Sequence, residues 1–430
     1  MRKALLAILA IGLLTTQVNA AGFSFAQQGA KATGLGGAVT ARINDGSAIF
    51  YNPAGITKIK GFHAYIGGTM VMVNASYVPF DETNSYSAIS DTSVVPAGYI
   101  TYELDGVFTL GLGMGNAFGS RLKWEDNHPQ AEVIQEIQLK APTISTVLGW
   151  DLNESFPGLS LAAGIDVTMG SLYLKRALPF GTDVASVEAG AQAVGVSGRF
   201  GMMVESDMVE GASFGISVRL PIQLDFLGTA DFSAPSSDIR GQLPADGEAS
   251  GRLTLPLVLN AGFAYDMMEN FTLSMDISFF GWESYKEFKL KLPQTLGSSD
   301  LNSYAVSTRD WYSTVSSKIG LEYTLGDLAV RMGASLDKSP VPDHTLDSSL
   351  PDSDRIFMNC GLGYKFGGGF NIDAAGIYKI PGSRRPLESR FRENQPKYKA
   401  EYTLGGILVA VYVGYSWAGD EEGAEGGQEG

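Results

Sequence analysis

The sequence is poor in the residues that mark disulfide-stapled, metal-binding and nucleic-acid-binding proteins. It has one cysteine, Cys360, which allows no internal disulfide. Its three histidines lie on separate predicted elements, so their spacing predicts no metal site: His63, His128 and His344. We expect no cofactor. Acidic residues outnumber basic ones by 46 to 31, and such a surface repels nucleic acid, which argues against nucleic acid as a partner.

Long uncharged runs are also scarce. One of them, Thr403–Gly419, approaches the length of about 18 residues that a transmembrane helix needs. Its larger apolar residues, however, occupy alternate positions: Ile407, Val409, Val411, Val413, Tyr415 and Trp417. A period of two that is rich in β-branched residues predicts a strand rather than a helix.

The first twenty residues predict export. Arg2 and Lys3 precede an apolar run, Ala4–Leu14, and a short polar stretch then ends at Ala20. This is the pattern of a signal peptide (residues 1–20) that is cleaved after Ala20. The alternative is a membrane anchor, but the apolar run is too short to span about 30 Å of hydrocarbon as a helix.

The rest of the chain repeats the alternating pattern many times. Glycine makes up 53 of the 430 residues, which suits strands and tight turns better than long helices. In stretches such as 271–282 and 355–367, one face is apolar and the other carries Gly, Ser and charged residues. Alternation alone fits both a soluble sandwich and a membrane barrel, because both have one apolar face.

Strand length separates these two architectures. We predict fourteen strands, near residues 62–74, 92–104, 106–116, 139–152, 159–172, 189–206, 211–223, 252–266, 270–285, 308–325, 327–338, 355–367, 369–380 and 402–417. Most are longer than ten residues. Strands of soluble proteins usually have about five or six residues, whereas membrane strands need about 9–11 to cross the hydrocarbon at a tilt.

The connections alternate between short and long, and this is the arrangement of outer-membrane barrels. Short turns include Asp105-Gly106 and Gly326-Asp327, and long loops include 117–138 and 224–251. We therefore predict an all-β fold: a transmembrane antiparallel up-and-down β-barrel of 14 strands, residues 62–417, in the outer membrane of a Gram-negative bacterium. A closed barrel leaves no unpaired backbone in lipid. We expect a monomer, surrounded by outer-membrane lipid and inserted by the barrel-assembly machinery.

Two segments flank the predicted barrel. Residues 21–61 are rich in small residues but contain aromatic ones, including Phe23 and Phe25, that would be costly to leave in water. A barrel of this size leaves a sizeable interior, so we expect this segment to fold into the lumen as a plug. Residues 418–430 are acidic and lack large apolar residues, which predicts a disordered tail.

At Ala21 the chain begins to resemble a known family. The run AGFSFAQQGAKATGLGGAVTARINDGSAIFYNPAGIT is similar to the start of mature FadL/TodX-type outer-membrane transporters, and Asn52-Pro53-Ala54 resembles their NPA signature. Residues 255–282 and 331–366 are similar too. The resemblance implies a fourteen-stranded barrel closed by an N-terminal hatch. It also implies inward diffusion of long-chain fatty acids or aromatic hydrocarbons. These would be captured among external loops, held in an inner pocket and released sideways at a kinked third strand.

The residues themselves favour parts of this interpretation. Asn-Pro initiates turns, so Asn52 and Pro53 fit a hatch turn, with an ordinary hairpin tip as the alternative. The third strand contains Gly111, Gly113 and Gly115, and glycine in a strand marks bulges or kinks. Alternatively, these glycines relieve crowding against the hatch.

An amphiphilic substrate needs an apolar slot and a cation for its carboxylate. Three basic residues on polar strand faces are candidates: Arg199, Lys318 and Arg331. Their alternative role is a structural ion pair with Glu205, Asp276 or Glu322. Phe23 and Phe25 are candidates for lining the apolar part.

Catalysis is the least supported class. Gly211–Gly215 matches G-x-S-x-G, but a nucleophile elbow needs a strand, a turn and a helix, and here the motif opens a strand. We therefore predict no enzyme and assign no catalytic residue. The alternatives to a channel for hydrophobic compounds are a porin for hydrophilic solutes and an outer-membrane lipid hydrolase that uses Ser213.

Overall fold

The structure is a computed structural model that describes residues 22–24, 27–293, 304–386 and 399–417. The predicted signal peptide, Phe25 and the acidic tail 418–430 lie outside the described residues.

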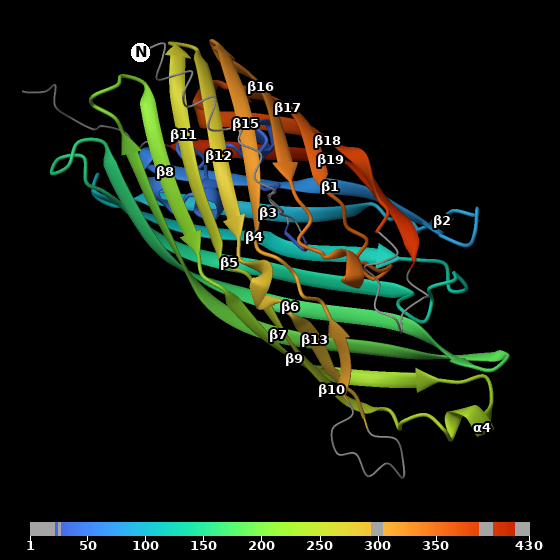
Figure 1. Cartoon of the computed structure of the whole chain (residues 1–430). Helices are drawn as coiled ribbons and strands as arrows, with labels where there is room; N and C mark the ends of the chain where they lie inside the picture. The colour runs from blue at the N-terminus through green and yellow to red at the C-terminus, as the bar shows by residue number, and fades with distance from the viewer. Residues whose placement is uncertain (1–21, 25–26, 294–303, 387–398, 418–430) are drawn as a thin grey trace, which may run out of the picture.

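The wall of the molecule is one antiparallel sheet that contains all nineteen strands of the described residues (Figure 1). Ten wall strands are continuous: β1 (Phe62–Pro79), β3 (Ser93–Glu103), β4 (Phe108–Lys123), β5 (Glu136–Asp151), β6 (Leu159–Phe180), β7 (Asp183–Glu205), β16 (Leu328–Asp337), β17 (Arg355–Lys365), β18 (Phe370–Arg384) and β19 (Ala400–Trp417). Four are interrupted: β8 (Ala212–Arg219) with β9 (Ile222–Ser233), β10 (Gly247–Leu255) with β11 (Val258–Met268), β12 (Phe271–Phe280) with β13 (Glu287–Lys291), and β14 (Tyr304–Thr308) with β15 (Thr314–Leu325). The short β2 (Tyr86–Ser87) flanks β1. The fourteen predicted wall strands are thus confirmed.

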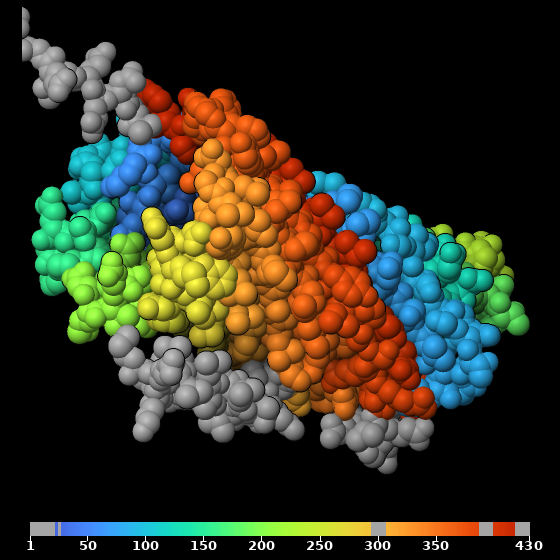
Figure 2. Space-filling view, turned by 90° about the horizontal axis from the view of Figure 1, so that it is seen from above, coloured from blue at the N-terminus to red at the C-terminus, as the bar shows by residue number. Residues whose placement is uncertain are grey.

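The sheet closes on itself because its first and last strands pair. Strand β1 runs antiparallel to β19 without a break in register, from Phe62 opposite Trp417 to Pro79 opposite Ala400. Figure 2 shows the red last strand directly beside the blue first one. Closure removes both sheet edges, which is what a sheet in lipid requires.

Side chains alternate across this wall as the sequence predicts. On β7, Val194, Val196 and Phe200 point outward and are exposed, while Arg199 points inward and is buried. Aromatic pairs lie near one end of the strands, for example Phe214 with Phe263, whose ring centroids are 5.2 Å apart. Such bands mark the level of a membrane interface in barrels. They lie near the rim that carries the short turns, which we call the short-turn rim.

The described part of the N-terminal segment, residues 22–24 and 27–61, folds inside the barrel. Its elements are short: α2 (Ala30–Gly34), α3 (Ala48–Tyr51) and η1 (Pro53–Lys58). Gly36 and Gly37 follow α2, and both have positive φ. Residues with a side chain would be strained in this backbone conformation. Most of the segment's apolar side chains are buried against inward-facing residues of the wall. No helix among the described residues is long and apolar enough to cross a membrane.

The wall bends where the four strands are interrupted, on the side of the rim that carries the long loops. Pro221 and Pro256 lie at two of the breaks, and proline offers no N–H group to a ladder. Beyond the breaks, β9, β10 and the ends of β6 and β7 continue as an extension with its own apolar core, capped by α4 (Ser237–Arg240; Figure 1). The extension carries the long loops away from the lumen's centre.

Candidate functional site

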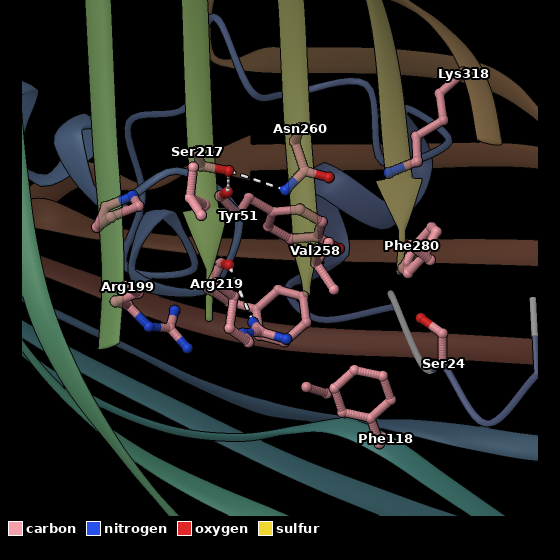
Figure 3. A pocket seen from close by; sticks show the side chains of 14 residues that line it. Ser24, Tyr51, Phe118, Arg199, Ser217, Arg219, Val258, Asn260, Phe280 and Lys318 are labelled. Atoms are coloured by element: carbon pink, nitrogen blue, oxygen red, sulfur yellow. Dashed lines mark hydrogen bonds between the residues drawn. The ribbon is translucent and has the colours of Figure 1, made fainter. Parts of the chain in front are cut away.

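A pocket with a cavity volume of about 40 Å³ lies in the lumen between the N-terminal segment and the wall. This volume is well below the range of about 300–1,000 Å³ that is typical of small-molecule pockets, so a ligand of that size fits only when part of the lining moves. Residues of both the N-terminal segment and the wall line it: Ser24, Phe50, Tyr51, Pro53, Ala117, Phe118, Arg199, Ser217, Val218, Arg219, Val258, Asn260, Phe280 and Lys318 (Figure 3).

The apolar part of the pocket depends on a bulge in β4. The register of β4 against β5 shifts between Asn116 and Phe118. Regular alternation would send Ala117 and Phe118 to opposite faces, yet both are buried. A bulge permits this, because it inserts one extra residue and re-aims its neighbours. Phe118 consequently faces Phe280 and Val258 across the pocket (Figure 3).

The start of the N-terminal segment binds to the bulged stretch of β4. Ser24 forms an isolated bridge with Phe118, and the Gly119 N–H donates to the Phe23 carbonyl at 2.9 Å. The Gln28 side chain donates to the Asn116 carbonyl. The segment therefore supplies the backbone partners around the bulge and closes the pocket on this side.

The polar part of the pocket contains two arginines that share one buried carboxylate. Arg199 donates from Nε and Nη2 to the two oxygens of Asp166, both at 2.6 Å, and from Nη1 to the Ile49 carbonyl. Arg219 is held more loosely: its Nε lies 3.6 Å from Asp166, makes no hydrogen bond and is buried. The Arg219 guanidinium also stacks on Phe50, 4.6 Å from the ring centroid. Arg219 thus keeps hydrogen-bonding capacity for a further group.

Lys318 is the third cation of the lining. Within the described part of the chain, no carboxylate lies within 4.0 Å of its ammonium group. Asp276 is its register partner across β12 and β15, but Asp276 accepts instead from the N–H groups of Val39 (3.0 Å) and Thr40 (2.9 Å). Figure 3 shows Lys318 and Arg199 at opposite edges, with Arg219 between them.

These charges do not cancel. Three cations, Arg199, Arg219 and Lys318, face two carboxylates, Asp166 and Asp276, which leaves one positive charge in excess. An excess charge in a low-dielectric cavity attracts an anion more strongly than the same charge at a surface.

The other residues predicted to bind substrate lie outside this lining. Arg331 pairs with Glu322 at 2.6 Å and Asp373 at 2.5 Å, elsewhere in the lumen. Phe23 packs edge-on against Trp282 beside the pocket rather than in its wall. Phe25 falls outside the described residues.

The predicted NPA signature pins the segment to the wall. The Asn52 side chain is fully buried, donates to the carbonyls of Thr40 (2.7 Å) and Met202 (2.9 Å), and accepts from the Ala54 N–H (3.2 Å). Pro53 then starts η1, where its missing N–H costs nothing. Gly201 of β7 makes this approach possible, since a Cβ atom there would lie 2.8 Å from the Ala54 nitrogen.

The three glycines of the third strand face the N-terminal segment. A Cβ atom at Gly111 or at Gly113 would lie 3.0 Å from the Ile49 side chain. Gly115 meets Gln28 in the same way. These positions allow close packing, and the register shift itself follows them, at Ala117.

Sequence reasoning missed Arg219, Phe118 and Phe280. A signal for Arg219 and Phe280 was present, because each shares a strand face with small polar residues, opposite the apolar face. No such signal exists for Phe118, since its inward orientation comes from the bulge.

The structure gives Ser213 no catalytic setting. It lies inside β8, paired with Glu205 on one side and Ala264 on the other, as an ordinary strand residue. Among the described residues, no three histidine, cysteine or acidic side chains are grouped as metal ligands.

Comparison with known proteins identifies the family. The sequence matches the family model described as outer membrane protein transport protein (OMPP1/FadL/TodX) over residues 11–417. The chain belongs to the OMPP1/FadL/TodX family. The family assignment confirms the predicted outer-membrane location, and it supports a transport protein over an enzyme. The short-turn rim is therefore the periplasmic rim.

Individual relatives agree over nearly the whole chain. The long-chain fatty acid transport protein of Salmonella typhi is 24% identical over 409 residues, which cover 87% of this chain and 91% of the relative. The 47 kDa outer membrane protein of Pasteurella multocida is 22% identical over 437 residues, covering 93% and 96%.

Solved structures of the OMPP1/FadL/TodX family share the fold. A Pseudomonas aeruginosa FadL homologue superposes with a TM-score of 0.79 at 17% identity, covering 92% of this chain and all of its own. The P. putida toluene transporter TodX gives 0.74 at 17% identity, covering 92% and 99%. At such low identity the likeness establishes the barrel and not the cargo.

Proposed function

We propose that the protein is a diffusion channel that takes up hydrophobic compounds, long-chain fatty acids or hydrocarbons, across the outer membrane. External loops capture the compound, the lumenal pocket holds it, and the N-terminal segment acts as the hatch that gates the pocket. The observation that carries this proposal is the pocket itself. It is apolar at Phe118, Phe280 and Val258, cationic at Arg219 and Lys318, and lined by both the N-terminal segment and the wall.

The pocket's chemistry favours an amphiphile with one anionic end. A carboxylate beside Arg219 would accept the hydrogen bonds that this guanidinium leaves unmade, and Lys318 would add a second positive charge. The hydrocarbon chain would lie against Phe118 and Phe280. Arg199, already held by two bonds to Asp166, would position this arrangement rather than bind the ligand.

The bulge in β4 is the proposed lateral exit. The stretch Asn116–Phe118 interrupts the ladder with β5, and the start of the N-terminal segment covers it from the lumen. Displacement of Gly22–Ser24 would open the pocket toward the bulge, and so toward the membrane on the other side of the wall. The glycines Gly111, Gly113 and Gly115 would then let β4 shift without side-chain clashes.

A porin for hydrophilic solutes would need an open lumen, and the buried N-terminal segment argues against one. We also propose that the protein works as a monomer, because a single barrel supplies every residue of the pocket. Outer-membrane lipid and the barrel-assembly machinery remain its proposed partners, together with the hydrophobic cargo.

Substitution of Arg219 tests the carboxylate site. Arg219→Gln should weaken binding of a long-chain fatty acid such as oleate by about tenfold or more, since a hydrogen bond to a charged group contributes about 1.5–3 kcal/mol. Binding of toluene should stay within about twofold. Lys318→Ala should act in the same direction. Equilibrium binding of both radiolabelled ligands to the purified full-length chain measures these effects.

Arg252→Gln is the matched control, because Arg252 pairs with Asp225 on the exposed outer surface. It should change neither affinity. Equal losses for oleate and toluene in Arg219→Gln would contradict a carboxylate role.

A further inference from the structure

Three neighbouring turns of the periplasmic rim form one continuous surface. They connect β5 to β6, β7 to β8 and β11 to β12. The Glu205 N–H donates to the Gly158 carbonyl at 3.0 Å and so joins the first turn to the second. The Asp266 N–H donates to the Gly211 carbonyl at 2.9 Å and joins the second to the third. The turns therefore present a fixed surface rather than three independent tips, at the upper left of Figure 1.

This surface exposes large apolar side chains. We call them the methionine patch: Phe156, Met208, Val209, Met267 and Met268. Met208 is 95% exposed, the highest value among the large apolar residues of the described chain, and Met268 is 64% exposed. Methionine is flexible and polarisable, and it is overused at surfaces that bind partners.

The patch is not a general feature of the rim. The other periplasmic turns have Asp or Gly at their tips: Asp105-Gly106, Gly326-Asp327 and Gly367–Gly369. Those short turns need glycine for positive φ.

Position argues against simple burial of the patch in lipid. The aromatic pair Phe214–Phe263 marks the interface level on β8 and β11. Met208 precedes the first residue of β8, Ala212, so it projects past that level toward the periplasm.

Charge argues in the same direction. Four exposed acidic residues border the patch, Glu154, Asp207, Glu210 and Glu269, and its three turns contain no lysine or arginine. An anionic lipid leaflet or the chain's own acidic C-terminal residues would be repelled, whereas a basic surface would be attracted.

The same turns hold the underside of the N-terminal segment. Lys58 pairs with Glu205 at 3.2 Å, and Arg42 pairs with Asp266. A partner on the patch would therefore sit next to the ion pairs that connect the segment to the rim.

We propose that the methionine patch is a docking surface for a periplasmic protein whose contacting face is apolar and bordered by lysine and arginine. Methionine and phenylalanine supply an adaptable apolar centre, and the acidic border selects the partner's charge. Docking there places the partner beneath the proposed hatch. An effect of the partner on the hatch rests on the proposed function, whereas the contact itself does not.

A synthetic amphipathic helix of leucine and lysine serves as the probe. It is titrated against the full-length chain in nanodiscs of zwitterionic lipid, with empty discs as the blank, and binding is followed by fluorescence anisotropy. We expect saturable binding that weakens with salt and falls at least about tenfold in Met208→Ser combined with Met268→Ser. Leu325→Ser, an exposed apolar residue at a turn outside the patch, should leave it unchanged. Equal binding of a peptide with glutamate in place of lysine would overturn the proposal.

A second measurement decides between a protein partner and lipid. Cys360 is the single cysteine, so Met208→Cys in a Cys360→Ser background accepts one environment-sensitive dye. We expect the attached dye to emit as it does in water, and we expect nitroxide-labelled lipid not to quench this emission. Quenching by that lipid would place the patch in the leaflet and overturn the proposal. Neither measurement needs a bound cargo, so its failure leaves the transport proposal intact.

Discussion

His128 shows how one residue can organise an external loop. Its Nε2 donates to the Ile134 carbonyl at 2.7 Å, and in the neutral ring its Nδ1 accepts from the Tyr77 hydroxyl at 2.8 Å. Trp124 stacks on the same ring and donates to the Ser348 carbonyl of another loop at 3.0 Å. Burial lowers the pKa of His128 below its ordinary value of 6.5, against weaker opposing effects of the hydrogen bond to the Ile134 carbonyl and of the Asp126 charge.

Acid should therefore loosen this loop. Folding favours neutral His128, so its contribution to stability is complete above the ordinary pKa of 6.5 and is lost as the pH falls from there toward the lowered pKa. We expect amide exchange of residues 124–135, corrected for its intrinsic rate, to be faster at about pH 5.5 than at about pH 7.5. His128→Gln should remove the difference, whereas His344→Gln should keep it. A pH effect that persists in His128→Gln would contradict the assignment.

At the scale of elements, one ionic cluster connects the N-terminal segment to the wall. Arg331 on β16 bridges Glu322 on β15 and Asp373 on β18, and Lys31 of α2 lies 3.5 Å from Glu322. The Asn359 amide of β17 donates to the Thr33 carbonyl at 2.8 Å beside it. The cluster thus ties three strands and the segment together.

Removing its central cation should be costly. Arg331→Met leaves two largely buried carboxylates without their main partner, and breaking a buried pair in this way typically costs about 3–5 kcal/mol. Urea unfolding in micelles should show a loss of this size. Arg252→Met removes an exposed pair with Asp225, and the expected cost is about 0–1 kcal/mol. Equal losses in the two variants would show that the cluster does not stabilise the barrel.

The strands themselves could be predicted because lipid imposes a simple rule on them. Strand stretches that face lipid have an apolar outer face, so period two is legible in stretches such as Phe271–Phe280. The length of β6 and β7 could not be read in this way. Their outer ends, around Leu174 and Val187, pack on α4 and β10 rather than on lipid, and that partner is distant in the chain.

The pocket was predictable only in part, for a related reason. Arg199 and Lys318 are charged residues on polar strand faces, which the alternation reveals. Which cation is free depends on partners such as Asp166 and the Ile49 carbonyl, and these meet Arg199 only in the folded barrel. The position of Phe118 depends on a bulge that local sequence did not reveal.

For the whole molecule, the N-terminal segment decides whether the lumen conducts. Its residues Ala30, Ala48 and Ile56 are fully buried inside the ring of strands, so little space remains for water. We expect the full-length chain in planar bilayers to show no steady conductance. Deletion of residues 22–60 should give stepwise ion currents, with heat-modifiable gel migration as the control for a folded barrel. Steady currents from the intact chain would favour a porin.

The pairing of β1 with β19 also has a consequence for biogenesis. The seam joins Phe62 to Trp417, so the ring cannot be completed before the ribosome has made nearly the entire polypeptide. Until then, two strands with unsatisfied backbone groups are open to any other extended chain. A premature stop anywhere upstream of Ala400 would thus yield a chain that lacks β19 and cannot close the barrel. The cell must degrade such a chain before it aggregates with other proteins.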